Sequence, residues 1–175
     1  MRYFESPQQY VLNPEQACLF LAGGICGCPD WQAEVVEMLK YDPIDLINPR
    51  RMDFPMHDPA AAETQIKWEF EHLRMAHGIL FWFPYETLCP IVLYELGAHS
   101  MTHRALFVGT HPKYARKQDV EIQTRLARPE LVVENYLPAL VQRVREWAVK
   151  LARVTACEDM RVLRALDYAI EQTEK

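Results

Sequence analysis

The sequence has no hydrophobic run long enough to cross a membrane. A membrane-spanning helix needs roughly 18 or more consecutive apolar residues, and no stretch of this chain approaches that length. Residues 1–16, MRYFESPQQYVLNPEQ, also lack the apolar core of an export signal. The sequence therefore predicts neither a membrane protein nor a secreted one.

The chain lacks paired cysteine motifs, and the spacing of its cysteines excludes two common classes of small protein. The chain has five cysteines, an odd number, and only two of them lie close together, as C-G-C. This spacing is neither the paired CxxC framework of a zinc site nor the disulfide scaffold of a small secreted domain. A reducing, cytoplasmic location fits best. The positions are Cys18, Cys26, Cys28, Cys89 and Cys157.

The chain also lacks an excess of basic residues. Its formal net charge is -5 at pH 7, whereas a protein that binds nucleic acid polymers generally presents a basic face. An acidic balance leaves a small nucleoside or nucleotide ligand open. The 175 residues, 50% hydrophobic and 25% charged, have the composition of a soluble globular protein. No repeat, linker or low-complexity tract divides them, so we expect one domain over residues 1–175.

Common catalytic and nucleotide-binding motifs are missing as well. A glycine loop, AGGICG, follows the first apolar run, but it does not match G-x-G-x-x-G and no Walker lysine follows. Gly23 and Gly24 fit a tight turn between a strand and a helix, and they also permit a ligand to approach the backbone closely. No Ser-His-Asp or Cys-His arrangement stands out.

The sequence does contain a regular alternation of apolar runs and amphipathic segments. The apolar runs predict strands and the amphipathic segments predict helices, the first of them with Asp30 as its N-cap. The predicted strands cover residues 17–24, 44–49, 78–84, 105–109 and 130–135. The predicted helices cover residues 31–41, 60–76, 90–102, 118–127, 137–154 and 159–172.

These strands show no alternation of polar and apolar residues, so both faces of their sheet must be covered by helices. We therefore expect an α/β, flavodoxin-like, doubly wound parallel sheet of five strands in the order 2-1-3-4-5. Its core covers about residues 17–135, followed by C-terminal helices over residues 137–172. In this order, the ligand-binding crevice opens where the first and third strands end.

One carboxylate lies in an otherwise apolar and small-residue run, CPIVLYELGAHS. The helix that carries this residue, Glu95, begins just beyond the loop after the third strand, which places Glu95 at the predicted crevice. From spacing alone it is a solvated or His99-paired glutamate, or else a catalytic carboxylate of the kind that apolar clefts contain. A third reading is a metal site of Glu95, His99 and His103, but it needs the helix to stay regular as far as His103. We expect no metal and no cofactor.

Other candidate binding residues flank the same edge of the predicted sheet. Asn48, Arg50 and Asp53 follow the second strand, where an Asn-Pro turn with solvated charges is the alternative to a ligand site. Trp68 and Glu69 lie on the next helix, and Trp68 by itself fits a core position.

Five segments, in this order along the chain, resemble the nucleoside 2-deoxyribosyltransferase-like family. They are LFLAGGI with the following DWQ, INPRR with DFP, QIKWE, ILFWFP with ETLCPI and LYELG, and VGTHPKYARKQDVEIQ. The resemblance implies a flavodoxin-like fold and cleavage of N-glycosidic bonds with retention. It also implies that the glutamate of the E-L-G motif, Glu95, is the nucleophile. Glu69 is then the best-placed group to protonate the leaving base or to hold the sugar hydroxyls.

The sequence departs from the family pattern at two positions. Cys89 stands where characterised transferases carry an acid six residues before the nucleophile, and Phe70 stands at a second acidic position, one residue after Glu69. Cys89 is thus a candidate for base recognition. The substrate is then either a nucleoside or a nucleotide, whose phosphate Arg50, Arg51 or the glycine loop would hold.

The expected function is therefore glycosyl transfer or hydrolysis on a (deoxy)nucleoside or nucleotide through a covalent glycosyl-glutamate. The alternative is a non-catalytic nucleotide-binding or sensing module on the same fold. Because members of this family commonly assemble so that a neighbouring subunit closes each site, we also expect a homo-oligomer.

Overall fold

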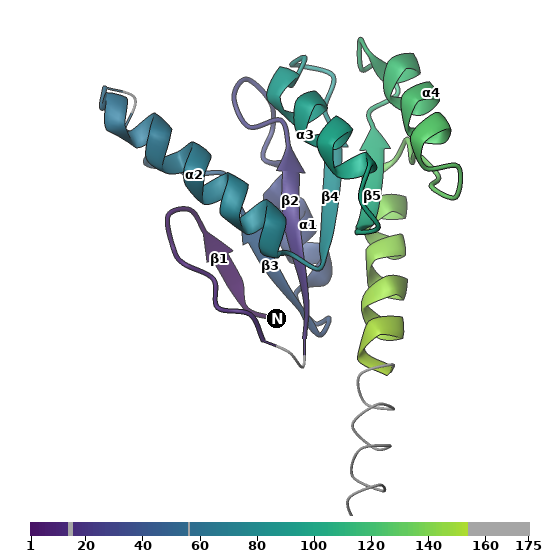
Figure 1. Cartoon of the computed structure of the whole chain (residues 1–175), viewed down its shortest axis with the longest axis horizontal. Helices are drawn as coiled ribbons and strands as arrows, with labels where there is room; N and C mark the ends of the chain where they lie inside the picture. The colour runs from purple at the N-terminus through teal and green to yellow at the C-terminus, as the bar shows by residue number, and fades with distance from the viewer. Residues whose placement is uncertain (14–15, 56, 154–175) are drawn as a thin grey trace, which may run out of the picture.

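A computed structural model describes residues 1–13, 16–55 and 57–153 of the protein. At its centre is a parallel sheet of five strands in the order β1-β3-β2-β4-β5 (Figure 1). The strands are β1 (Tyr3–Glu5), β2 (Ala17–Gly23), β3 (Ile44–Asn48), β4 (Gly78–Phe83) and β5 (Ala105–Thr110). The helices are α1 (Trp31–Leu39), α2 (Pro59–Met75), α3 (Pro90–Ser100) and α4 (Lys117–Ala127), followed by a helix over residues 137–153.

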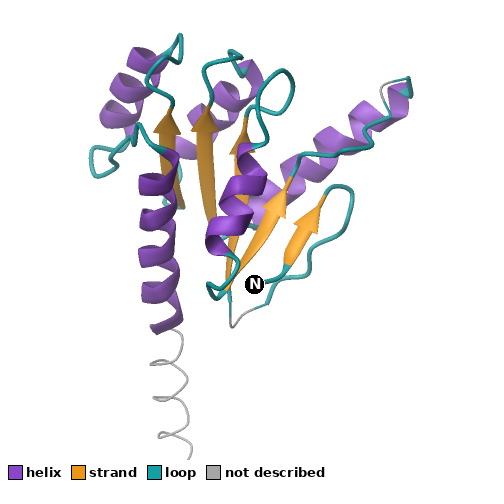
Figure 2. Ribbon diagram, turned by 180° about the vertical axis from the view of Figure 1, so that it is seen from behind, coloured by secondary structure: helices purple, strands orange, loops and turns teal. Residues whose placement is uncertain are grey.

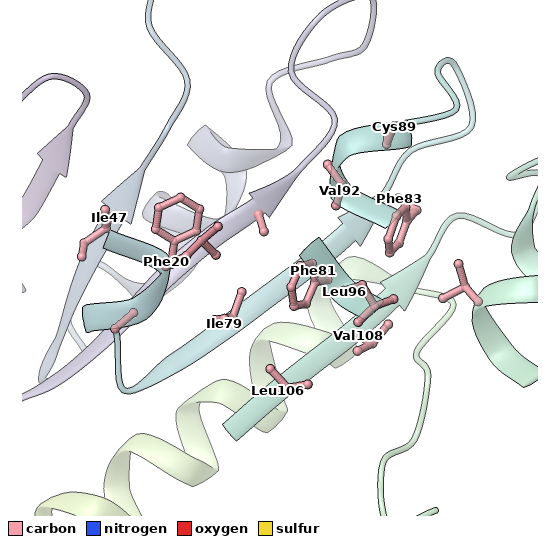
Figure 3. Close-up of a cluster of buried hydrophobic side chains, with 14 of the residues drawn as sticks. Phe20, Ile47, Ile79, Phe81, Phe83, Cys89, Val92, Leu96, Leu106 and Val108 are labelled. Carbon is pink, nitrogen blue, oxygen red and sulfur yellow. The ribbon is translucent and has the colours of Figure 1, made fainter. Parts of the chain in front are cut away.

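Helices cover both faces of the sheet because its central strands are apolar on both faces. Every residue of β2, β3 and β4 is buried. The helix α1 and the helix of residues 137–153 cover one face of the sheet (Figure 2). Leu19 and Leu21 of β2 belong to the hydrophobic cluster on that face. Phe20 belongs to the cluster on the other face, where side chains of α3 meet those of β4 and β5 (Figure 3). The predicted doubly wound α/β architecture is confirmed.

The strand order differs from the predicted one only at the edges of the sheet. The first four predicted strands are β2, β3, β4 and β5, in the expected relative order. The strand β1, which the sequence did not predict, adds to the edge beside β3. It is held there because Arg2 pairs with the buried Asp45 of β3 through both its side chain and its backbone.

The predicted fifth strand, residues 130–135, is wrong as a strand. It forms only an isolated bridge between Gly109 and Glu134. Leu131 and Val133 instead pack against the hydrophobic core, which accounts for an apolar run without a ladder.

Helix boundaries fall close to those predicted. Asp30 caps α1 as expected, because its carboxylate accepts the backbone N–H of Ala33 at 3.0 Å. The helix α3 ends at Ser100, two residues before the predicted end. The predicted helix at 159–172 lies outside the described residues. Within the described ranges, no helix is both long and apolar enough to cross a membrane.

Candidate active site

A cavity of about 580 Å³ opens at the carboxyl ends of β2 and β4. The loop after β2, the loop after β4, and the helices α2 and α3 form its walls. Most of the side chains that line it are apolar, among them Phe20, Phe54 and Val92. Two carboxylates, Glu69 from α2 and Glu95 from α3, line the same cavity. The sequence placed the ligand crevice at this edge of the sheet.

Glu95 lies in the second turn of α3, and its carboxylate is mostly buried. Burial, with the added charge of Glu69, raises the pKa of Glu95 to about 7. No hydrogen bond or ion pair reaches this carboxylate from the rest of the described chain. His99, one turn further along α3, does not pair with it, and burial together with Arg104 and Arg74 lowers the pKa of His99. Glu95 is therefore poised between its neutral and ionised forms near neutral pH.

Glu69 has a different environment in the same cavity. Burial raises the pKa of Glu69, but a hydrogen bond from Gln65 opposes that rise, because it favours the ionised form. The Gln65 amide donates to Glu69 Oε1 at 2.8 Å. Glu69, which accepts this hydrogen bond, is therefore more readily ionised than Glu95.

The glycine loop after β2 forms one wall of the cavity, and neighbouring side chains fix its shape. The Gly24 carbonyl accepts the indole N–H of Trp31 at 2.8 Å. A Cβ at Gly23 would lie 2.4 Å from the Trp31 ring, and one at Gly24 would lie 2.6 Å from Pro84. Both glycines are thus required by packing, and both border the space open to a ligand.

Arg50 and Asn48 hold this loop and its surroundings. The Arg50 guanidinium donates to Gln32 Oε1 and to the Pro29 carbonyl, each at 3.0 Å, and pairs with Asp30 at 3.3 Å. Asn48 is buried, does not line the cavity, and accepts the Arg50 backbone N–H at 3.0 Å. The hydrogen bonds of both residues are therefore used within the protein.

Fewer hydrogen bonds within the protein hold the side chain of Arg51 than that of Arg50. It lines an adjoining cavity of about 490 Å³ that shares Gln65 and Glu69 with the first one. Its side chain is 13% exposed and lies 3.6 Å from Asp53, whose side chain is 86% exposed. Among the described residues, its buried Nε has no hydrogen-bond acceptor. Asp53 itself lies outside both cavities.

The comparison with protein families fits this geometry. The family model for nucleoside 2-deoxyribosyltransferase-like proteins matches residues 16–114, which include the glycine loop, Glu69 and Glu95. The chain belongs to this family. A comparison with curated proteins finds no significant match. The strand β1, the helix α4 and the helix of residues 137–153 lie outside the part that the family model matches.

Two residues of the family motifs, Cys89 and Trp68, lie in different places: Cys89 lines the cavity and Trp68 does not. Cys89 lines the cavity at the start of α3 and adopts a left-handed backbone conformation, with φ 49°. Burial raises the pKa of its thiol to about 11, so the thiol stays neutral near pH 7. Trp68 is buried, stacks on His72 at 4.0 Å, and donates its indole N–H to the Gln8 carbonyl. Trp68 does not line the cavity.

The geometry of α3 does not support a metal site of Glu95, His99 and His103. Because α3 ends at Ser100, His103 does not continue the helical face that carries Glu95 and His99. The described part of the chain contains no group of three or more His, Cys, Asp or Glu side chains arranged to hold a metal ion.

Sequence reasoning missed polar residues of the cavity, and Gln65 is the one that contacts a carboxylate. It lies one turn before Glu69 on α2, and the i, i+4 spacing was the available signal. It also missed the apolar rim, where Ile66 and Phe70 of α2 face Ile91 and Tyr94 of α3 across a further groove of about 530 Å³. The pattern of a single helix does not show this groove, because it lies between α2 and α3.

Proposed function

We propose that the protein cleaves the N-glycosidic bond of a (deoxy)nucleoside or nucleotide, with Glu95 as a covalent nucleophile. The observation that carries the proposal is the placement of two carboxylates with unequal surroundings in one apolar cavity. Membership of the nucleoside 2-deoxyribosyltransferase-like family supports a glycosyl-transfer reaction.

In the first step, an ionised Glu95 oxygen bonds to the anomeric carbon while the bond from that carbon to the base nitrogen breaks. The electron pair of the broken bond stays on the base, which takes a proton from solvent. The transition state resembles an oxocarbenium ion, whose positive charge the nearby carboxylates stabilise. A water or a second base then attacks the same carbon, gives up a proton to solvent and releases the carboxylate, which completes hydrolysis or transfer with retention.

The order of proton affinities favours one of the two roles open to Glu69. Glu95 is half protonated near pH 7, whereas Gln65 stabilises the ionised form of Glu69. An ionised Glu69 is a poor proton donor and a good acceptor for a sugar hydroxyl. We assign it to holding the sugar, and base release should rise as the pH increases through about 7, where Glu95 ionises.

A trapping experiment tests the covalent step. A 2′-fluoro-2′-deoxynucleoside destabilises the oxocarbenium-like state and slows breakdown of the ester, so the glycosyl-enzyme should accumulate. Mass spectrometry of the digested protein should find the added sugar on the peptide containing Glu95. A label on another residue would refute the mechanism. The absence of label and of free base with a panel of nucleosides and 5′-monophosphates would favour a non-catalytic binding module.

Both classes of compound in that panel, nucleosides and 5′-monophosphates, are chosen for a structural reason. Arg51 supports a 5′-monophosphate as substrate, because it lines the adjoining cavity with a cationic side chain that is able to pair with a phosphate. The apolar lining of the main cavity suits a base or an unphosphorylated nucleoside. The four free thiols among the described residues fit a reducing cytoplasm for the reaction.

We further propose that a second copy of the chain covers the mouth of the cavity. The mouth patch consists of Ile66, Phe70, Ile91 and Tyr94, all exposed, with Tyr94 78% exposed. Exposed apolar side chains grouped at one place on a surface commonly mark an interface. The mouth patch lies on α2 and α3, the two helices that carry the carboxylates. A second copy bound there would exclude water from the reaction.

Tyr94→Arg should therefore convert the oligomer to a monomer and reduce base release, because a charge at the centre of an apolar interface opposes association. Light scattering coupled to gel filtration measures the mass. Tyr41→Arg is the matched control, since Tyr41 is also a highly exposed tyrosine but follows α1, away from the cavity. A wild-type protein that is monomeric at all concentrations would contradict the proposed assembly.

A further inference from the structure

The side chain of Gln65 connects Glu69 to the N-terminal segment of the protein. Its amide nitrogen donates to Glu69 Oε1 at 2.8 Å and to the Pro49 carbonyl at 2.9 Å. Its amide oxygen accepts the Ser6 hydroxyl at 2.6 Å. Gln65 and Ser6 are both buried. Both N–H groups of this amide and one acceptor position on its oxygen are thus occupied, by partners from three different segments of the chain.

The partners of Gln65 fix the direction in which its amide points. The Pro49 carbonyl can only accept a hydrogen bond, and an ionised Glu69 can also only accept. An amide turned by 180° would present its oxygen to both of them and leave two buried acceptors without donors, which is costly. Ser6 is the only partner that is able to donate, and its hydroxyl meets the amide oxygen. The hydrogen-bond pattern therefore admits one orientation.

Building on the proposed function, we propose that Gln65, oriented by Ser6, is the positioning residue that holds the Glu69 carboxylate toward the sugar of the substrate. Gln65 acts through Glu69, although it also borders the cavity. Ser6 lies just after β1, outside the part of the chain that matches the family. The N-terminal segment is thus part of the active-site framework and not only an edge of the sheet.

The proposal has an electrostatic consequence that can be measured. The Gln65 hydrogen bond lowers the pKa of Glu69 against the effect of burial. Removing the donor should raise that pKa, since burial then acts alone. The remaining charged or titratable side chains that line the cavities next to Glu69 come from several elements. They are Cys26, Arg50, Arg51, Arg74, Cys89, Tyr94, Glu95, His99 and Arg104.

The first experiment measures the protonation of Glu69 directly and needs no substrate. In a Glu95→Gln background, which removes the coupled acid, the carboxyl carbon of Glu69 is followed by NMR as the pH changes. Gln65→Met should move the titration of Glu69 to higher pH, and Ser6→Ala should move it in the same direction by less, because the amide is then free to turn. Thr64→Ala is the control, since its hydroxyl only bonds the Ala60 carbonyl within α2, and it should change nothing.

The second experiment uses the otherwise unmodified enzyme and a substrate that it cleaves. Gln65→Met should raise KM by about tenfold, the loss expected for one hydrogen bond to a charged group, while Thr64→Ala leaves KM unchanged. Ser6→Ala, which removes only a hydroxyl, keeps the test available if Gln65→Met does not fold. An unchanged titration of Glu69 in both variants would overturn the inference. A shifted titration in a protein that cleaves no substrate would instead retain the hydrogen-bond relay and refute the proposed function.

Discussion

Replacing Glu95 by glutamine should reduce the release of free base by about ten-thousandfold or more. The amide keeps the shape of the side chain but is a poor nucleophile, so the covalent step is lost while the cavity stays formed. Glu95→Ala should have the same effect on activity. Free base is measured by chromatography after incubation with the best substrate of the nucleoside and 5′-monophosphate panel.

The control for this substitution is Glu71→Gln, which changes an exposed acid on α2 close in sequence to Glu69. It removes the same charge from the protein and should leave base release unchanged. Activity of Glu95→Gln within tenfold of the wild type would rule out Glu95 as the nucleophile, and with it the covalent mechanism.

Glu95→Gln should also be more stable than the wild type above neutral pH. The pKa of Glu95 is about 7 in the folded protein and near 4.5 in the unfolded chain. Between these values the folded state holds the proton more tightly, so the stabilisation by that proton is complete below pH 4.5 and is lost as the pH rises through 7. Glutamine never ionises and avoids this loss, which is of the order of 1 to 3 kcal/mol. Thermal unfolding at pH 5 and pH 8 should reveal a much larger difference at the higher pH.

The sequence predicted the central sheet because its signals are local. Unbroken apolar runs such as residues 78–84 form strands that helices cover on both faces, and the crossovers between them allow few strand orders. The edge strand β1 had no such signal. It contains only three residues, two of them partly buried, and its position depends on the contact of Arg2 with Asp45, 43 residues away.

For the site, too, the sequence revealed what depends on local signals and not what depends on contacts between distant residues. A family motif and a position on α2 were enough to select Glu95 and Glu69 as candidates. The roles of Arg50 and Asn48 were not visible, because they depend on hydrogen bonds to Gln32, Pro29 and Tyr3 that the fold brings together. The i, i+4 spacing of Gln65 and Glu69 is local, but the bonds that fix the Gln65 amide are not, since Ser6 lies 59 residues before it.

Glu69→Ala should lower base release by about a hundredfold, a smaller loss than that of any Glu95 variant. The nucleophile remains, but a sugar hydroxyl loses its acceptor and the oxocarbenium-like state loses a nearby negative charge. Because the missing hydroxyl contact acts on both the bound substrate and the transition state, KM should rise as kcat falls.

The pH dependence of this variant separates electrostatics from simple damage to the site. The charge of Glu69 is one of the two causes that raise the pKa of Glu95. Without that charge, Glu95 should ionise at lower pH, so the rising limb of kcat/KM against pH should move to the acid side of its wild-type position near 7. Glu69→Gln should move the limb in the same direction while retaining an amide oxygen that accepts a hydroxyl, and should therefore lose less activity than Glu69→Ala. A limb that stays in place in both variants would show that the two carboxylates do not interact, and would remove the basis for assigning them complementary roles in one reaction.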